Sequence, residues 1–314
     1  MKHKFSNSYA IAVLIVSIAF SASVSAQTKK TVAAAAFRAV TIESLPGAIV
    51  WLDGVRFGKT GNDGKLTINT VAAGAHTIRL RVDGYKEKLQ PLTATQKGTV
   101  KVDLVKTTDE AELAFQEAER LTTADREKSA AAYRKAIKAR PNFPEAYLGL
   151  ARVLLDSGDG EEAEKAILQS RKLRVAYAEA SAVEGRIQKE IGEEAKAIAA
   201  FKRAITEGKG YQPEAYAGLG LLYKEKAETA GGSGDFEGEN TNYTESAKSL
   251  KTALKQLSGA PDAMVIYQLV GLIYERQKRY ADAIALYEEF LQIFPDTAEA
   301  TAVRSFITQL KKEQ

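Results

Sequence analysis

Hydrophobic and polar positions alternate with a period of two between residues 40 and 105, wherever the chain is not interrupted by Gly, Pro, Asn or Asp. Apolar residues stand at 78, 80 and 82, and again at 100, 102 and 104, with polar residues between them. Turn dipeptides ending in glycine, at 53–54, 63–64 and 83–84, separate such runs. The pattern predicts about six short strands. We expect them to form a small antiparallel β-sandwich, with the single tryptophan, Trp51, in or near its core.

Beyond residue 108 the apolar residues recur at helical spacing, and Ala, Glu, Lys, Leu and Tyr largely replace glycine. A large residue with a small residue four positions before it recurs five times. These large residues are Tyr133, Ile167, Phe201, Leu250 and Tyr287, separated by 34, 34, 49 and 37 positions. Small residues at such points let paired helices approach closely, so we expect about five helix pairs and a capping helix at roughly 297–311. Glycine and proline breaks argue against the alternative, a long coiled coil.

The spacing of 49 residues marks an interruption of the fourth helix pair. The segment at about 227–243, AETAGGSGDFEGENTNY, is rich in glycine and acidic residues. Insertions in repeat arrays map to loops. We therefore predict an inserted loop here, solvated rather than organised as a calcium site.

The strand-rich region carries Pro46-Gly47-Ala48, Asp53-Gly54 and Gly84-Tyr85 in the order and spacing of a known family. It resembles the PEGA domain, a small β-sandwich of bacterial envelope proteins. The run GKTGNDGKLTI is similar to carboxypeptidase regulatory-like sandwiches as well, so both families remain open. Either resemblance implies an accessory binding or spacing domain and not a catalyst.

The last helix pair of the region, YQLVGLIYERQKRYADAIALYEEFLQIFP, resembles the tetratricopeptide repeat (TPR) at every position of its pattern. That resemblance implies a superhelical solenoid whose first helices line a groove for a peptide or protein. The expected fold class is α+β multidomain: a small antiparallel β-sandwich followed by an all-α TPR superhelical solenoid. The expected domains are a signal peptide at 1–26, a linker at 27–39, a PEGA-like sandwich at 40–106 and a TPR array at 107–314.

The TPR resemblance also implies which residues face the groove. Transferring the inner positions of the repeat onto this chain gives a protein-binding set of Leu148, Arg152, Leu155, Arg186, Lys189, Leu221, Lys224, Leu272, Glu275 and Arg276. Cations among aliphatic residues would suit an acidic, partly apolar segment of a partner. Leu148 and Arg152 stand where some relatives clamp a terminal carboxylate with Asn and Lys, so that specificity is not expected.

The first residues have the layout of a secretory signal: lysines at 2 and 4, an apolar run from Tyr9 to Phe20, and Val24-Ser25-Ala26 before the expected cut. The apolar run is short for a spanning helix, which needs about 20 residues. We expect export to the periplasm or the cell exterior, with no stable transmembrane anchor after cleavage. Cleavage would leave 42 Lys and Arg against 40 acidic residues, so no basic footprint for nucleic acid is expected.

The chemistry of the side chains disfavours an enzyme. The chain has no cysteine, and therefore no disulfide, thiol nucleophile or thiolate metal site. No catalytic or nucleotide-binding motif stands out, and His76, the one histidine after the signal, is expected to pack at the start of a strand. We expect no cofactor, no metal and no catalytic residue.

These features together predict a non-catalytic scaffold or adaptor of the bacterial cell envelope. In this prediction the groove holds a peptide or protein partner, while the sandwich contacts an envelope component or spaces the array from it. The alternative is an envelope glycan-binding sandwich, for peptidoglycan or a surface polysaccharide, with the array as a stalk.

Overall fold

The computed structural model describes residues 37–313, which lie in one compact unit. The signal peptide predicted at 1–26 and most of the linker predicted at 27–39 lie outside the described residues. Residues 38 and 39 of that linker already belong to a strand. Among the described helices, none combines the length and apolarity needed to cross a bilayer.

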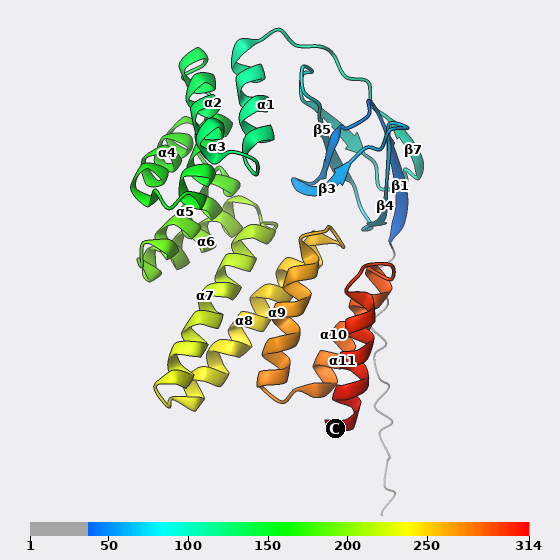
Figure 1. The fold of residues 1–314 in the computed structure, drawn as a ribbon, viewed down its shortest axis with the longest axis vertical. Helices are drawn as coiled ribbons and strands as arrows, with labels where there is room; N and C mark the ends of the chain where they lie inside the picture. The colour runs from blue at the N-terminus through cyan, green and yellow to red at the C-terminus, as the bar shows by residue number, and fades with distance from the viewer. Residues whose placement is uncertain (1–36, 314) are drawn as a thin grey trace, which may run out of the picture. The chain divides into compact units, whose positions relative to one another are not determined.

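Strands occupy the first part of the described chain (Figure 1). They are β1 (Arg38–Glu43), β2 (Ile49–Leu52), β3 (Val55–Lys59), β4 (Lys65–Val71), β5 (His76–Arg81), β6 (Lys88–Leu92) and β7 (Gly98–Lys101). One sheet has the order β4-β1-β7 and the other β3-β2-β5-β6. Asp53 and Gly54, both with positive φ, form the two-residue turn between β2 and β3, as hairpins of this length require.

The sandwich is not purely antiparallel, which differs from the prediction. β1 pairs antiparallel with β4 but parallel with β7, Val40 lying opposite Gly98 and Ile42 opposite Val100. The chain leaves β6 in one sheet and enters β7 in the other, so β7 does not continue a hairpin. Alternation of polarity shows which residues face the core but carries no information about strand direction.

Alternating residues of both sheets form the core of the sandwich, as the pattern predicted. Ile78, Leu80, Val100 and Val102 are all buried there. Trp51 is not part of this core. It alternates with buried Val50 and Leu52, so its ring lies on the opposite face of β2 and is only half-buried.

Helices fill the rest of the described chain (Figure 1). They are α1 (Glu110–Leu121), α2 (Arg126–Ala139), α3 (Pro144–Asp156), α4 (Gly160–Leu173), α5 (Ala178–Glu190), α6 (Glu194–Glu207), α7 (Pro213–Gly232), α8 (Phe236–Leu257), α9 (Ala263–Arg276), α10 (Tyr280–Ile293) and α11 (Ala300–Glu313). Consecutive helices pack as hairpins, α1 with α2 through α9 with α10, and α11 packs on α10. The predicted sandwich followed by a helical solenoid is thereby confirmed.

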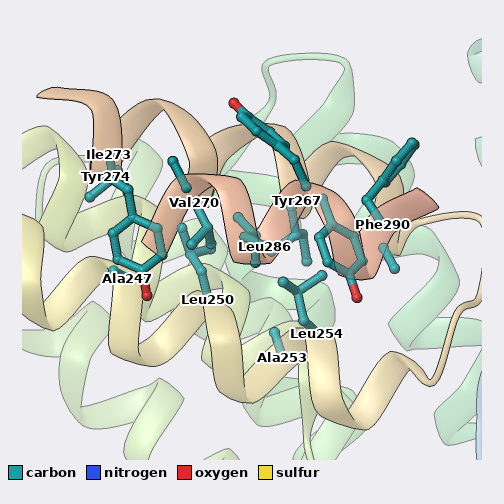
Figure 2. Packing of buried hydrophobic residues seen from close by; sticks show 14 of the residues in the cluster. Ala247, Leu250, Ala253, Leu254, Tyr267, Val270, Ile273, Tyr274, Leu286 and Phe290 are labelled. Carbon is teal, nitrogen blue, oxygen red and sulfur yellow. The ribbon is translucent and has the colours of Figure 1, made fainter. Parts of the chain in front are cut away.

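Small residues allow close approach within and between these hairpins. A Cβ atom added at Gly185 of α5 would lie 2.6 Å from the Phe201 ring of α6, and one at Gly220 of α7 would lie 2.5 Å from Leu250 of α8. The large residue thus fills the space that glycine leaves. Figure 2 shows the resulting packing between α8, α9 and α10, where Leu250, Tyr267 and Phe290 are buried.

The segment 227–243, predicted as an inserted loop, is almost entirely helical. The extra residues lengthen α7 and α8, and only Ser233, Gly234 and Asp235 lie between the two helices. Ala227 and Tyr243 are buried in the apolar cluster of α8 to α11. Packing and a cap on α8 therefore override the low helix propensity of the glycines.

Candidate functional site

The predicted groove residues lie on the first helices of the hairpins α3–α4 to α9–α10. We call the surface of α3, α5, α7 and α9 that carries them the first-helix face. Two of the predicted residues do not contribute an open surface: Leu148 and Leu155 of α3 are buried in the cluster that also contains Tyr177, Val183 and Ile187 around α5. The next repeat covers them, so they serve as core residues.

Ion pairs join neighbouring first helices across this face. Arg152 of α3 contacts Glu214 of α7 at 2.5 Å. Arg186 of α5 contacts the same carboxylate at 3.5 Å and Asp156 of α3 at 3.2 Å. These contacts place α3, α5 and α7 side by side, with the predicted arginines turned toward acids of their own chain.

The remaining predicted cations also have acidic partners. Lys189 lies 2.7 Å from Glu225, and Lys224 lies 2.5 Å from Glu228. Arg276 donates to Glu239 at 2.8 Å. Ion pairs of this kind at the surface contribute little to stability. Their consequence here is electrostatic: the first-helix face carries no excess of unpaired cations among the predicted residues.

Exposed aliphatic side chains are the remaining feature of the face. Leu221 of α7 is 38% exposed, and Leu272 of α9 is 58% exposed. Val265, also on α9, is 60% exposed and was not predicted. It lies seven positions before Leu272, which is about two helical turns and therefore the same side of α9. That spacing could have identified Val265 from the sequence.

Glu275, the last predicted residue, serves its own hairpin: it accepts a hydrogen bond from the Tyr287 hydroxyl at 2.8 Å. Next to the face, a cleft of about 520 Å³ lies where α7 and α8 extend past α5 and α6. Lys189, Leu222, Glu225 and Asn242 line part of it. The cleft adjoins the first-helix face through Lys189.

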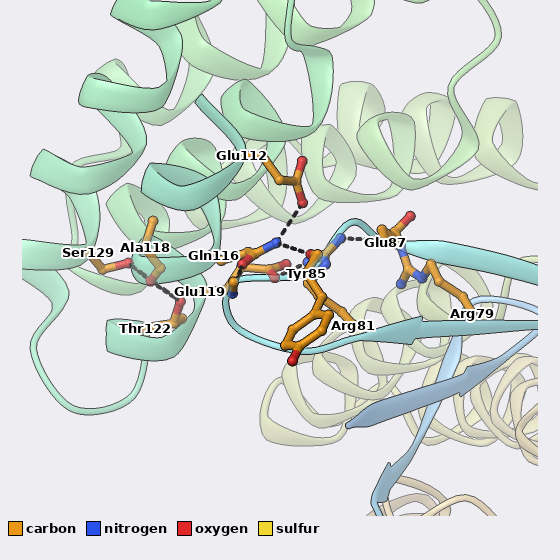
Figure 3. A network of polar contacts seen from close by, with 11 residues as sticks. Arg79, Arg81, Tyr85, Glu87, Glu112, Gln116, Ala118, Glu119, Thr122 and Ser129 are labelled. Carbon is orange, nitrogen blue, oxygen red and sulfur yellow. Dashed lines mark hydrogen bonds and ion pairs between the residues drawn. The ribbon is translucent and has the colours of Figure 1, made fainter. Parts of the chain in front are cut away.

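A polar network joins the sandwich to the first helix of the array (Figure 3). Arg81 of β5, whose side chain is 6% exposed, pairs with Glu119 of α1 and with Glu87. Its guanidinium carbon lies 4.7 Å from the centre of the Phe115 ring. This arrangement buries an arginine with two carboxylates and an aromatic face, which compensates its lost hydration.

Gln116 of α1 completes this network. Its Nε2 donates to the Tyr85 carbonyl at 2.8 Å and to Glu112 at 2.9 Å, while its Oε1 accepts from the Gly84 amide at 2.8 Å. The turn at 83–87 is therefore held on α1 by hydrogen bonds between the Gln116 side chain and the main chain of Gly84 and Tyr85 (Figure 3).

Trp51 lies under two arginines of the adjacent strand. It is paired with Arg79 across β2 and β5, and the Arg79 guanidinium carbon lies 4.3 Å from the centre of the indole ring. The Arg81 carbon lies 5.4 Å from it. Burial lowers the pKa of Arg79, partly offset by Glu87. Stacking with Arg79 accounts for a tryptophan outside the core.

His76 has a carboxylate partner that is remote in sequence. Its Nδ1 lies 2.6 Å from Asp53 Oδ2, and its Nε2 lies 3.0 Å from the Ala72 carbonyl. Asp53 Oδ1 accepts from the Thr77 amide at 2.8 Å. His76 is thus a structural tie between the start of β5 and the turn after β2. The sequence prediction missed Asp53 because 23 residues separate the pair.

A second junction between sandwich and array lies beside this tie. A cavity of about 210 Å³ is lined by residues of the sandwich, including Asp53, Phe57 and His76, and by Tyr211 and Lys255 of the array. Burial, together with the Asp53 carboxylate, raises the pKa of Tyr211 to about 12. The Tyr211 hydroxyl donates to the Gln256 carbonyl at 3.0 Å. Hydrogen bonds within the chain therefore occupy the polar groups of Asp53, His76 and Tyr211.

Three family models match the chain. A PEGA domain matches residues 37–108. Tetratricopeptide repeat models match residues 114–187 and 234–298. No curated protein sequence matches the chain. Within residues 37–313, no group of three or more His, Cys, Asp or Glu side chains is arranged to hold a metal ion.

Solved structures show similarity to part of the chain. The MamA protein is 23% identical with a TM-score of 0.43, and the match covers 62% of this chain and 96% of that one. TTC0263, a TPR protein of Thermus thermophilus, is 18% identical with a TM-score of 0.46, over 64% of this chain and 98% of that one. The first TPR of Spaghetti (RPAP3), bound to an HSP90 peptide, is 15% identical with a TM-score of 0.35, over 38% of this chain and 94% of that one.

The family models and the described fold agree on the two parts of the molecule. Residues 37–108 contain all seven strands of the structure, and the repeat models fall on helices of the array. The chain therefore carries a PEGA domain followed by tetratricopeptide repeats.

Proposed function

We propose that this protein is a non-catalytic scaffold of the bacterial cell envelope, whose array binds a peptide or protein partner. The TPR fold is generally a protein-interaction scaffold. PEGA domains occur in extracellular or periplasmic proteins, which supports the envelope location. The PEGA domain contacts an envelope component or spaces the array from it.

The observation that carries the proposal is the exposure of Leu221, Val265 and Leu272 on the first-helix face. Exposed aliphatic side chains on one face favour burial against another molecule. The predicted cations of this face are paired within the chain, which argues against recognition by charge. The partner segment that fits best presents apolar side chains to α7 and α9, for example along one side of an amphipathic helix.

The alternative of an envelope glycan bound by the sandwich has no comparable support. Aromatic rings that bind sugars need an open face, and Arg79 lies over the ring of Trp51. We therefore retain protein binding as the proposed activity of the molecule.

Affinity capture from envelope extracts tests the proposal with a matched pair of variants. The double variant Leu221→Ser and Leu272→Ser should lose the captured partner, because each substitution removes apolar contact area worth about 1–3 kcal/mol. Leu168→Ser is the control, since the exposure of Leu168, 49%, lies between those of Leu221 and Leu272, but Leu168 is on α4, a second helix. The proposed function would be contradicted if all variants captured the partner equally. It would also be contradicted if no protein eluted specifically with the wild-type chain.

A further inference from the structure

One side of α1, the first helix of the array, corresponds to the first-helix face of α3 and α5. Glu119 of α1 lies 33 residues before Arg152, which lies 34 residues before Arg186. Glu112, Glu145 and Glu179 repeat with the same separations. Because the repeat length is about 34 residues, Glu112 and Glu119 are on the side of α1 that corresponds to the first-helix face of α3 and α5. We include this side of α1 in the first-helix face from here on.

The sandwich of the same chain covers this part of the face. Arg81 pairs with Glu119, and the turn at 83–87 is hydrogen-bonded to Gln116, whose side chain is almost fully buried as a result. Farther along the array, a Cβ atom added at Gly54 would lie 3.9 Å from Glu179 Oε1 of α5. Arg79 is close enough to Glu179 for the charge of that carboxylate to raise the pKa of Arg79, against the larger lowering by burial.

The sandwich also reaches the last repeats. Val55 is buried in the apolar cluster formed by α8 to α11, and Phe57 packs against both that cluster and the sandwich core. A Cβ atom added at Gly259, between α8 and α9, would lie 3.1 Å from Thr70 of β4. The sandwich thus touches the first hairpin, the third hairpin and the residues around the end of α8, and so links repeats that are not neighbours in the array.

These contacts are few compared with those inside either part. The sandwich has its own apolar core, separate from the clusters of the array. The two parts are joined by the buried arginine network, the bonds of Gln116, the packing of Val55 and Phe57 on the array, and the junction at Tyr211. Contacts of this extent permit opening at a free energy below that of global unfolding.

We propose that the sandwich is a built-in cover of the array, seated on the first-helix face of α1 and the start of α5, and that a partner gains this part of the face only when the sandwich is displaced. This inference rests on the proposed function and adds its regulation. In the covered state the exposed residues of α7 and α9 are accessible, while the face of the first repeats is occupied by Arg81 and the 83–87 turn. A partner that binds the uncovered state better shifts the equilibrium toward it.

Two pairs of variants separate the contact from general effects on folding. Glu119→Gln removes the array partner of Arg81, and its control is Glu117→Gln, two positions away on α1 and paired with Arg120 of the same helix. Val55→Ser weakens the contact with the last repeats, and its control is Val105→Ser, at an exposed valine. Val55 belongs to the cluster of the array and not to the sandwich core, so its loss leaves that core intact.

Trp51 is the only tryptophan of the chain and lies beside Arg79 and Arg81, so its fluorescence reports on this contact. In the full chain, Glu119→Gln and Val55→Ser should each raise the quenching of Trp51 by acrylamide, and the fluorescence of added anilinonaphthalene sulfonate, by about twofold. The two controls should match the wild-type chain. Far-UV circular dichroism should be unchanged in all four variants.

The proposal is overturned if a Glu119→Gln, Val55→Ser double variant with wild-type circular dichroism leaves both fluorescence signals unchanged. If that variant fails to fold, hydrogen exchange of the wild-type chain decides. The amide of Gly84, which donates to Gln116 of α1, should then exchange faster than the amide of Lys86, which donates to the Val105 carbonyl within the sandwich, and equal protection of the two refutes the cover. Neither readout uses the partner. Failure of the cover therefore leaves capture through Leu221 and Leu272 intact, and failure of capture leaves the Trp51 result standing.

Discussion

At Gly185 of α5, a single hydrogen in place of a methyl group sets the distance between two helices. A Cβ atom there would lie 2.6 Å from two carbons of the Phe201 ring. Alanine gains about 1 kcal/mol of helix propensity over glycine, but overpacking in a core costs about 1–3 kcal/mol. Because the Phe201 ring is fully buried and also packs against Gly218, we expect Gly185→Ala to lower the free energy of unfolding measured in urea.

The matched control for this prediction is Gly232→Ala. Gly232 is the last residue of α7, and no atom lies within 4 Å of a Cβ added there. Alanine should therefore be neutral or slightly stabilising at this position. Equal stability of the two variants would show that α5 and α6 can separate to admit the methyl group.

Residues whose neighbours come from the same periodic pattern were predictable, and residues with remote partners were not. Alternation identified Ile78 and Leu80 as core residues because burial on one face of a strand is a local property. Trp51 was misplaced because a guanidinium on the neighbouring strand can stabilise a large ring outside the core. Leu148 was expected in an open groove, but it is buried because the following repeat packs on it. The spacing of residues within its own helix does not show that contact.

At the scale of elements, the extension of α7 and α8 shows how a cap can decide between helix and loop. Asp235 is the N-cap of α8, and its carboxylate accepts a hydrogen bond from the Gly238 amide at 2.8 Å. Loss of an aspartate cap costs about 0.5–2 kcal/mol. We expect Asp235→Ala to destabilise the chain by about that amount and to increase hydrogen exchange at the start of α8.

Asp262 provides the control for the cap. It is the N-cap residue of α9 but makes no side-chain capping hydrogen bond. Asp262→Ala should therefore change the free energy of unfolding by much less. If both substitutions were equally costly, the stability of α8 would not depend on its cap, and the packing of Ala227 and Tyr243 would have to account for it.

The sequence indicated each helix pair through its small and large residues, but it was misleading in the 227–243 segment. Glycine and acidic residues are typical of loops, and propensity is only a weak local preference. Here Glu239 binds Arg276 of α9 at 2.8 Å, so the added turns of α8 pack on the next hairpin. Such tertiary contacts cannot be derived from residue spacing within one element. The same limit applies to β7, whose parallel pairing with β1 depends on a crossover between sheets.

At the scale of the whole molecule, stability is divided among separate apolar clusters. One cluster joins α1 to α5, another joins α8 to α11, and a third forms the sandwich core. The cluster between α5 and α7 is the smallest, with seven buried residues, four of them alanine. In repeat arrays, stability is approximately a sum of repeat and interface terms, so we expect this small cluster to mark the weakest interface of the array.

We therefore predict that the array unfolds first at α6 and the start of α7. Hydrogen exchange of the full chain in increasing urea should show α6 losing protection before α3–α4 and α9–α10. Ala197 and Ala283 occupy equivalent buried positions in α6 and α10, which gives a matched pair. Ala197→Gly should lower the urea concentration at which α6 loses protection, without a change in the other helices. Ala283→Gly should have the same effect on α9–α10. Simultaneous loss of protection along all helices, in both variants, would mean that the contacts of the sandwich with separate repeats couple the array into one cooperative unit.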